Sequence, residues 1–400
     1  MLRRRDRHPV RRRPALPTGL LGRLALGALR ALNHVVAERD TLAVLVGIPD
    51  VEDGMIAVAD ELLARGREVV LLTAGTRVPE GFHDPRVRTI PRRDPRAVWA
   101  YLRARDVFTT HGVYGERGGP TRQRLTYVWH GESTGKRIDR YLGGPAKPSS
   151  TAPVLSSVGQ AFRCAEFGLA PRSVPVVGAP RNDRMLRAPR GPHPLFIERA
   201  PARCRLLWMP TYRAGAVGHR RRTDSTRGQA GLPFDRDELA ELDRRLAALD
   251  VAVHVKLHPF AADAFDLRTS ALVPLTDADL WAAGLTTYTA LPRFDGLVTD
   301  VSSVWIDHLL LDRPVVVAFP DVEEYRATRG FALEPFEDWM PAPVARTVDD
   351  LVDEIAAVAA GDDPHAARRR ARRALLHAHD DDRSAARLLD VLGAGAARPA

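Results

Sequence analysis

Short, continuous apolar runs alternate along this chain with longer segments in which apolar residues recur at helical spacing. The run TLAVLVGI at 41–48 predicts a buried strand, and MIAVADELLARG at 55–66 predicts a helix that ends at a glycine. A second buried strand, EVVLLTA at 68–74, follows at once. Because apolar strands joined by helices are typical of a parallel sheet covered on both faces, this pattern predicts a βαβ unit.

The same alternation continues through most of the chain. Further strands and helices are predicted in AVWAYLRARDVFTTHG, LTYVWHGES, SVPVVGAPRND, CRLLWMPTYR, RDELAELDRRLAAL, VAVHVKLHPF, LVTDVSSVWIDHLLLDRPVVVAF and a carboxyl-terminal helical stretch. The arginine run ARRRARRALL at 367–376 is most simply interpreted as a solvated helix face. Around 187–203 the pattern lapses into the Pro- and Arg-rich composition of a linker. We therefore predict an α/β protein of two doubly wound halves joined near residue 195. Its predicted parts are an arm at 1–38, one domain at 39–190 and a second domain at 191–400.

Polar residues gather where the predicted strands end, which is where parallel α/β sheets bind their ligands. These polar segments are Trp129-His130-Gly131, Gly178 to Asp183, Pro210 to Arg213, Lys256 to Pro259, and Asp300 to Ser303. The last of them precedes a predicted helix, whose free N–H groups and the hydroxyls of Ser302 and Ser303 would favour a phosphate. Asp300 would cap that helix or orient the hydroxyls, and we also count it among the predicted substrate-binding residues. An ordinary helix cap without a ligand would use the same residue types.

The use of lysine favours the anion site. The chain has three lysines, at positions 136, 147 and 256, although arginine is abundant. Since arginine serves wherever a generic cation suffices, Lys256 beside His258 at a strand end suggests an ammonium and an imidazole that contact a phosphate oxygen. Taken alone, His258 would be interpreted as a structural histidine. Its position beside Lys256, together with the Ser302–Ser303 turn, indicates a functional site instead.

The positive charge of the chain is concentrated at its start. The formal charge is +9, and residues 1–30 hold nine arginines and one acid, so the rest of the chain carries only about +1. A nearly neutral body argues against nucleic-acid binding, which needs a basic face on the domain itself. The start resembles a signal peptide, but Arg23 and Arg30 interrupt its apolar run. It is interpreted either as a basic arm with an interfacial helix on an anionic leaflet or as a tail followed by an ordinary packed helix.

Length and cysteine content exclude other classes of protein. Four hundred residues are too many for one hydrophobic core and suit two domains. Two cysteines, Cys164 and Cys204, exclude a disulfide framework or a cysteine-built metal site and fit a reducing compartment. We predict that both thiols are inert.

Several of these segments together resemble the CDP-glycerol glycerophosphotransferases, the teichoic acid primases and polymerases of bacterial cell walls. The resembling segments run in order between about residues 107 and 355, and the most specific of them extends from Asp300 to Phe331; they are VWHGESTGK, GAPRND, MPTYR, KLHPF and LVTDVSSVWIDHLLLDRPVVVAFPDVEEYRATRGF. The resemblance implies a GT-B fold, in which two Rossmann-like lobes face a central cleft that holds the nucleotide donor. It further implies that no metal or other cofactor is needed, and that the protein attaches peripherally to the inner face of the cell membrane from the cytoplasm.

The resemblance also implies roles for individual residues. His130 would be the general base that deprotonates the acceptor hydroxyl, and Arg181 and Asn182 would line the cleft. The loop Glu323-Glu324-Tyr325 would contact the donor or the acceptor. Five residues would hold the donor's pyrophosphate and stabilise the departing CMP, with His258 acting in catalysis: Arg213, Lys256, His258, Ser302 and Ser303.

The expected partners are a CDP-polyol donor, either CDP-glycerol or CDP-ribitol, and a lipid-linked cell-wall polymer as acceptor. One departure from the family pattern affects the acceptor: Trp-His-Gly is followed here by Glu132-Ser133-Thr134-Gly135-Lys136 instead of a Thr-Pro-Leu-Lys run. A GT-B glycosyltransferase that uses a nucleotide sugar stays open as an alternative, and a non-catalytic membrane or nucleic-acid binding protein is a more distant one. The sequence leaves the polyol, the choice between primase and polymerase, and the oligomeric state undetermined.

Overall fold

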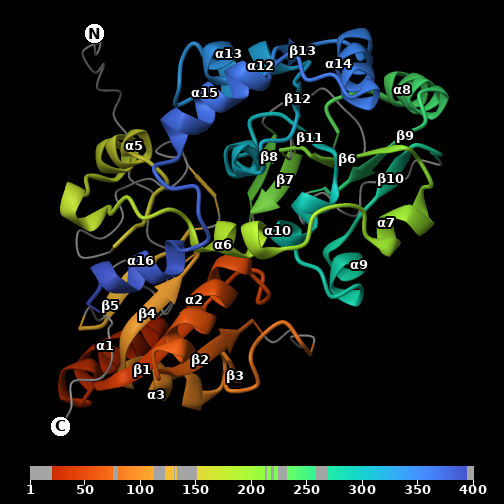
Figure 1. Ribbon diagram of the computed structural model, residues 1–400. Coiled ribbons are helices and arrows are strands. Elements are labelled where there is room, and N and C mark those ends of the chain that lie inside the picture. Colours follow the sequence, from red (N-terminus) through yellow and green to blue (C-terminus); the bar gives the residue numbers. More distant parts are fainter. Residues whose placement is uncertain are drawn as a thin grey trace.

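The chain forms two α/β lobes, each built on a parallel sheet (Figure 1). The computed structural model describes residues 20–74, 80–111, 122–129, 131–132, 151–211, 214–217, 220–223, 232–257 and 269–393, with the backbone alone for 20–26, 30, 214–217 and 220–223. The inner strands of the two sheets are continuous apolar runs, such as residues 42–46 and 315–318, as expected for sheets buried on both faces.

The amino-terminal lobe contains a five-stranded sheet in the order β3-β2-β1-β4-β5. Helix α2 lies on one face with the core residues Leu45, Met55 and Leu62, and helices α1 and α3 cover the other face. The elements are α1 (Leu20–Val35), β1 (Arg39–Val46), α2 (Asp53–Ala64), β2 (Glu68–Thr73), β3 (Arg88–Pro91), α3 (Pro95–Arg103), β4 (Ala104–Thr109), β5 (Arg124–Tyr127) and α5 (Ser157–Phe167).

The carboxyl-terminal lobe contains a six-stranded sheet in the order β10-β9-β6-β11-β12-β13, and β7 pairs with β8 as a separate antiparallel hairpin. Its strands are β6 (Cys204–Met209), β7 (Ala214–Val217), β8 (Arg220–Thr223), β9 (Val251–Val255), β10 (Leu272–Pro274), β11 (Gly296–Thr299), β12 (Val315–Ala318) and β13 (Val344–Ala345). Its helices are α7 (Pro194–Arg199), α8 (Arg236–Ala248), α9 (Asp277–Ala282), α10 (Thr287–Ala290), α11 (Val304–His308), α12 (Val322–Thr328), α13 (Phe336–Trp339), α14 (Val348–Ala360) and α15 (Ala366–Leu376).

Two helices connect the lobes. Helix α6 (Pro180–Arg187) packs on α2 and on α10, and helix α16 (Ser384–Val391) returns to the amino-terminal lobe (Figure 1). There Leu388 and Leu389 join the core beneath α2. The division near residue 190 stays a prediction, but the assignment of the whole of 191–400 to the second domain does not hold for α16.

Three local predictions need correction. Segment 173–183 was predicted to be a strand that ends in a loop, but only the single bridge Val154–Val176 forms, and helix α6 begins at Pro180. The predicted linker contains helix α7. The arginine run of α15 is not simply solvated, because Arg369 is buried and bonded to Asp312 and Asp363.

The prediction for residues 297–319 is confirmed. Segment 297–319 forms β11, a turn, α11 with a following 3₁₀ turn, and β12.

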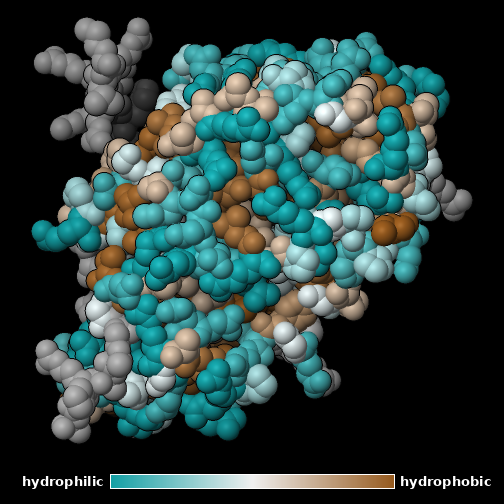
Figure 2. Space-filling model, viewed as in Figure 1, coloured by the Kyte–Doolittle hydropathy of each residue, from teal (hydrophilic) through white to brown (hydrophobic). Residues whose placement is uncertain are grey.

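Both cysteines are free thiols, and burial raises the pKa of Cys204 to about 12, so its thiol is protonated at neutral pH. None of the described helices combines the length and the apolarity needed to cross a bilayer. The face of the molecule in Figure 2 is largely hydrophilic, with apolar residues scattered over it.

Candidate active site between the lobes

The turn after β11 is locked to the end of β6 by one carboxylate. Asp300 is fully buried, and its oxygens accept from Thr211 N at 2.9 Å, Thr211 Oγ1 at 2.8 Å and Ser302 N at 2.9 Å. Since β6 and β11 are neighbouring strands, these bonds fix two strand ends together. Asp300 therefore positions the turn, and its burial argues against the direct substrate contact predicted from the sequence.

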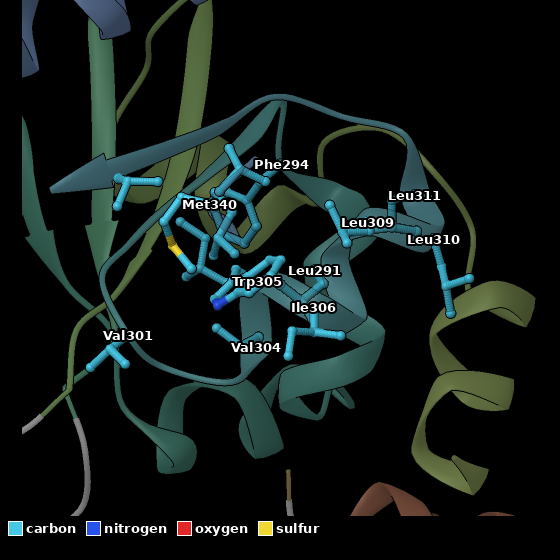
Figure 3. Packing of buried hydrophobic residues seen from close by; sticks show 14 of the residues in the cluster. Leu291, Phe294, Val301, Val304, Trp305, Ile306, Leu309, Leu310, Leu311 and Met340 are labelled. Atoms are coloured by element: carbon cyan, nitrogen blue, oxygen red, sulfur yellow. The ribbon is translucent and has the colours of Figure 1, made fainter. Parts of the chain in front are cut away.

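Helix α11 holds the turn from the other side. Its apolar residues Val304, Trp305 and Ile306 are inserted into the core of the carboxyl-terminal lobe (Figure 3). Ser303 occupies the N-cap position of α11, but its side chain makes no capping hydrogen bond. Ser302 and Ser303 are both half-buried. The turn is thus rigidly anchored, and neither hydroxyl is used as a helix cap.

The turn meets the other lobe at Gly131. A Cβ atom at Gly131 would lie 3.3 Å from Ser303 Cβ and would collide with Ser303 Oγ, so any larger residue here would force the serine side chain to move. This contact brings together two of the polar strand ends selected from the sequence, the Trp129-His130-Gly131 segment and the Ser302–Ser303 turn. His130, Arg213 and His258 themselves lie outside the described residues.

The backbone beside Gly131 is held in an unfavourable conformation. Trp129 has a φ of 62°, a left-handed conformation that is costly for a bulky side chain. The Arg163 guanidinium lies 4.7 Å from the centroid of the Trp129 ring, and the Phe167 ring packs edge-on at 5.9 Å. Arg163 also pairs with buried Glu132 at 3.7 Å, the residue at which the chain departs from the family pattern. Strain retained by such packing is typical of functional loops.

A buried ion pair fixes α11 to α6. Arg181 donates to both oxygens of Asp307 at 3.0 Å, and Tyr288 donates its hydroxyl to the same carboxylate at 2.8 Å. Burial lowers the pKa of Arg181, but Asp307, Tyr288 and Glu132 together raise it overall. The pKa of the Tyr288 hydroxyl is raised by burial and then by Asp307. Arg181 was predicted to contact the substrate, but it is 3% exposed and its guanidinium is taken up by Asp307. It therefore positions α11.

The second carboxylate between the lobes is Asp53 at the start of α2. It accepts from Arg184 Nε at 3.0 Å, from the Thr286 hydroxyl, and from Tyr288 N at 3.3 Å. Tyr288 thus joins two buried carboxylates, Asp53 of the amino-terminal lobe through its backbone and Asp307 through its hydroxyl. The lobe arrangement and the Ser302–Ser303 turn are connected through this residue.

Two other predicted site residues, Lys256 and Asn182, are both buried but have different surroundings. Lys256 is 8% exposed and pairs with Asp277 at 2.9 Å, so a phosphate here would share the ammonium with a carboxylate. Asn182 is buried in the first turn of α6, and its amide atoms have no hydrogen-bond partner among the residues that the structure describes. It has no access to solvent, so a direct role in lining the cleft is not supported.

The predicted contact loop Glu323-Glu324-Tyr325 is instead part of helix α12. Tyr325 is fully buried and stacks on Phe331 with 5.4 Å between ring centroids. Glu323 is exposed and pairs with Arg326 and with Arg346 at 3.3 Å. Tyr325 belongs to an aromatic core, and its burial argues against the predicted contact with a substrate.

Three positioning residues were missed in the sequence: Tyr288, Asp307 and Asp53. Asp307 had a usable signal, because it is a charged residue in the otherwise apolar segment that follows Ser303. Tyr288 and Asp53 had none, since their partners come from distant parts of the chain.

Glu52, the N-cap residue of α2, gives the site a dependence on pH. Burial and the adjacent Asp53 raise its pKa to about 7. Because this lies above the unfolded value of 4.5, the native state holds the proton more tightly, and stability falls as pH rises from about 4.5 to 7. The full effect is about 3 kcal/mol. Glu52→Gln should remove that part of the slope in urea unfolding between pH 4.5 and 8. An unchanged slope would show that Glu52 is ionised throughout.

Two parallel-sheet lobes, with strand-end turns that meet between them, define a GT-B protein. The chain matches the family described as CDP-Glycerol:Poly(glycerophosphate) glycerophosphotransferase over residues 31–393, and it belongs to that family. The solved structure of the wall teichoic acid polymerase TagF superposes with a TM-score of 0.68, covering 93% of this chain and 94% of that one at 15% identity, which shows a shared fold.

Two relatives illustrate the range of similarity in sequence. The chain is 34% identical over 152 residues to a teichoic acid ribitol-phosphate primase of Bacillus spizizenii, covering 38% of this chain and 34% of that protein. It is 25% identical over 262 residues to the teichoic acid ribitol-phosphate polymerase TarK of Staphylococcus aureus, covering 61% and 47%. The chain therefore spans less than half the length of these two relatives.

Proposed function

We propose that this protein transfers a polyol phosphate from CDP-glycerol or CDP-ribitol to a hydroxyl of a cell-wall polymer acceptor. The observation that carries the proposal is the contact of Gly131 with Ser303 between the lobes, in a chain of this family. It supports a cleft in which an acceptor-side loop meets a donor-side turn. Relatives named for ribitol phosphate and for glycerol phosphate are both similar to the chain, so the polyol is left open.

In the proposed reaction the acceptor oxygen attacks the phosphorus that carries the polyol. A new P–O bond forms, the bond to CMP breaks, and His130 takes the proton of the acceptor hydroxyl. The Ser302 and Ser303 hydroxyls donate to the pyrophosphate, and Arg213, Lys256 and His258 stabilise the charge on the departing CMP. The reaction as proposed uses no cofactor.

The serine hydroxyls give the test. Ser302→Ala or Ser303→Ala should each weaken CDP-glycerol binding by about 1 to 2 kcal/mol, the scale of a hydrogen bond to a charged group. CMP has one phosphate and should be much less affected. Calorimetry with both ligands measures this, and Ser270→Ala removes a hydroxyl elsewhere on the same lobe as a control. Equal losses for CMP and CDP-glycerol, or no loss for either, would show that the turn does not hold the pyrophosphate.

We further propose that the protein works at the cytoplasmic face of the cell membrane, on a lipid-linked acceptor. The basic composition of residues 1–30 supports this, because clustered arginines are attracted to anionic lipid. Deleting residues 1–30 should release the protein from anionic vesicles, and salt should weaken binding of the full chain. Salt-insensitive binding by the truncated chain would assign the contact to the body of the protein instead.

A further inference from the structure

A basic pocket lies on the amino-terminal lobe, lined by residues of β1, β3 and α3 and none of the strand-end turns between the lobes. Its volume is about 440 Å³. Leu42, Ile90 and Ala100 are buried lining residues that form an apolar floor. Among the described lining residues none is acidic, and four of the ten are arginines: Arg39, Arg88, Arg96 and Arg103. Charge and shape together therefore favour an anionic ligand.

Two of these arginines, Arg88 and Arg103, are available to a ligand. The other two are already paired: Arg39 with Glu68, and Arg96 with Asp94 at 2.6 Å. In the described part of the chain, Arg88 and Arg103 have no ion pair with a carboxylate. The pocket thus has positive charge that its own neighbours do not neutralise.

The charges are spaced along one face of α3. Positions 96, 99, 100 and 103 have the spacing of one helical face, and Arg96 and Arg103 are separated by roughly 10 Å along the axis. Trp99 lies between them and is 52% exposed, with the Arg103 guanidinium 5.9 Å from its ring centroid. Because Arg96 is already paired with Asp94, the charge on this face that no described carboxylate neutralises is Arg103, beside the Trp99 ring. With Arg88 of β3, the pocket offers two cations unpaired among the described residues and an exposed aromatic ring, which suits a ligand with more than one phosphate and C–H-rich carbons between them.

We propose that this pocket binds the phosphodiester-linked polyol chain itself, as a site for the growing acceptor apart from the site of transfer. The inference rests on the proposed function for the identity of the chain. Phosphates bond to the guanidinium groups of Arg88 and Arg103, and the polyol carbons pack on Trp99. A held chain stays near the enzyme between transfers, so the pocket favours extension of long acceptors over short ones.

The test uses the full-length protein and a fluorescently labelled glycerol-phosphate oligomer. Arg88→Gln with Arg103→Gln should weaken oligomer binding about tenfold or more, as expected when two charge-assisted contacts are lost. Trp99→Ala should weaken it as well. The control Arg172→Gln with Arg244→Gln removes two exposed arginines elsewhere and should bind like wild type. Equal binding by both double variants would overturn the proposal.

Two further measurements identify the source of the phosphodiester and separate this proposal from the proposed function. Binding to anionic vesicles that is lost in Arg88→Gln with Arg103→Gln, with oligomer binding retained, would assign the pocket to lipid and overturn the proposal. Transfer to a short acceptor should be unchanged in that variant and should fall only for long acceptors. Loss of oligomer binding in the variant, with no transfer by the wild type, would support the pocket and overturn the proposed transferase reaction.

Discussion

Replacing Asp307 by alanine should lower the free energy of unfolding by about 3 to 5 kcal/mol, the range for removing one partner of a buried ion pair. The Arg181 guanidinium would remain 3% exposed without its carboxylate, and the Tyr288 hydroxyl would lose its acceptor. Because α11 carries the Ser302–Ser303 turn at its start, donor binding should weaken as well. Urea unfolding and donor calorimetry measure the two effects.

Two variants calibrate that result. Tyr288→Phe removes only the hydroxyl, so it should cost about 1 to 2 kcal/mol and still reduce donor affinity if Tyr288 positions the turn. Asp349→Ala breaks an ion pair with Arg245 in which the carboxylate is 81% exposed, and it should change stability by less than about 1 kcal/mol. If Asp307→Ala lowered the free energy of unfolding no more than Asp349→Ala does, the positioning role of Asp307 would be contradicted.

Replacing Asp300 by alanine should destabilise the protein by about 3 kcal/mol, because three donors would lose a buried carboxylate. It should also weaken CDP-glycerol binding more than either serine variant does, since the whole turn loses its link to Thr211. Differential scanning calorimetry and donor titration check this.

The matched control is Asp295, which joins the same two strands at their other ends. It is exposed, and it accepts from Arg205 N at 2.8 Å. Asp295→Ala should therefore cost about 1 kcal/mol or less and leave donor binding unchanged. If Asp295→Ala weakens donor binding as much as Asp300→Ala does, the effect of Asp300 is general to the sheet and not specific to the turn.

The sequence pattern predicted the fold because both sheets are parallel and buried on both faces. Such strands are continuous apolar runs, so β1, β2, β9 and β11 were visible without tertiary information. The return of α16 to the first lobe was not visible, because an amphipathic helix does not specify which sheet it covers.

For the site, sequence reasoning found the segments better than the roles. Parallel sheets bind ligands at their strand ends, and the GT-B resemblance implies one cleft between the two lobes, so Gly131 and Ser303 could be expected near each other. Residue type alone did not separate ligand contacts from positioning residues. Arg181 and Asp300 are residue types that often bind substrates, but here their polar groups are bonded to residues of other elements. Arg181 donates to Asp307, and Asp300 accepts from Thr211.

The central claim is transfer of a polyol phosphate, and mass spectrometry of the products tests it most directly. The purified full-length protein is incubated with a lipid-linked disaccharide acceptor and, in parallel, with CDP-glycerol, CDP-ribitol or a nucleotide sugar. The account predicts that the acceptor gains the mass of a polyol phosphate from a CDP-polyol, that CMP is released, and that His130→Ala forms no product. An acceptor that gains a sugar from the nucleotide sugar and no polyol phosphate from either CDP-polyol would contradict it.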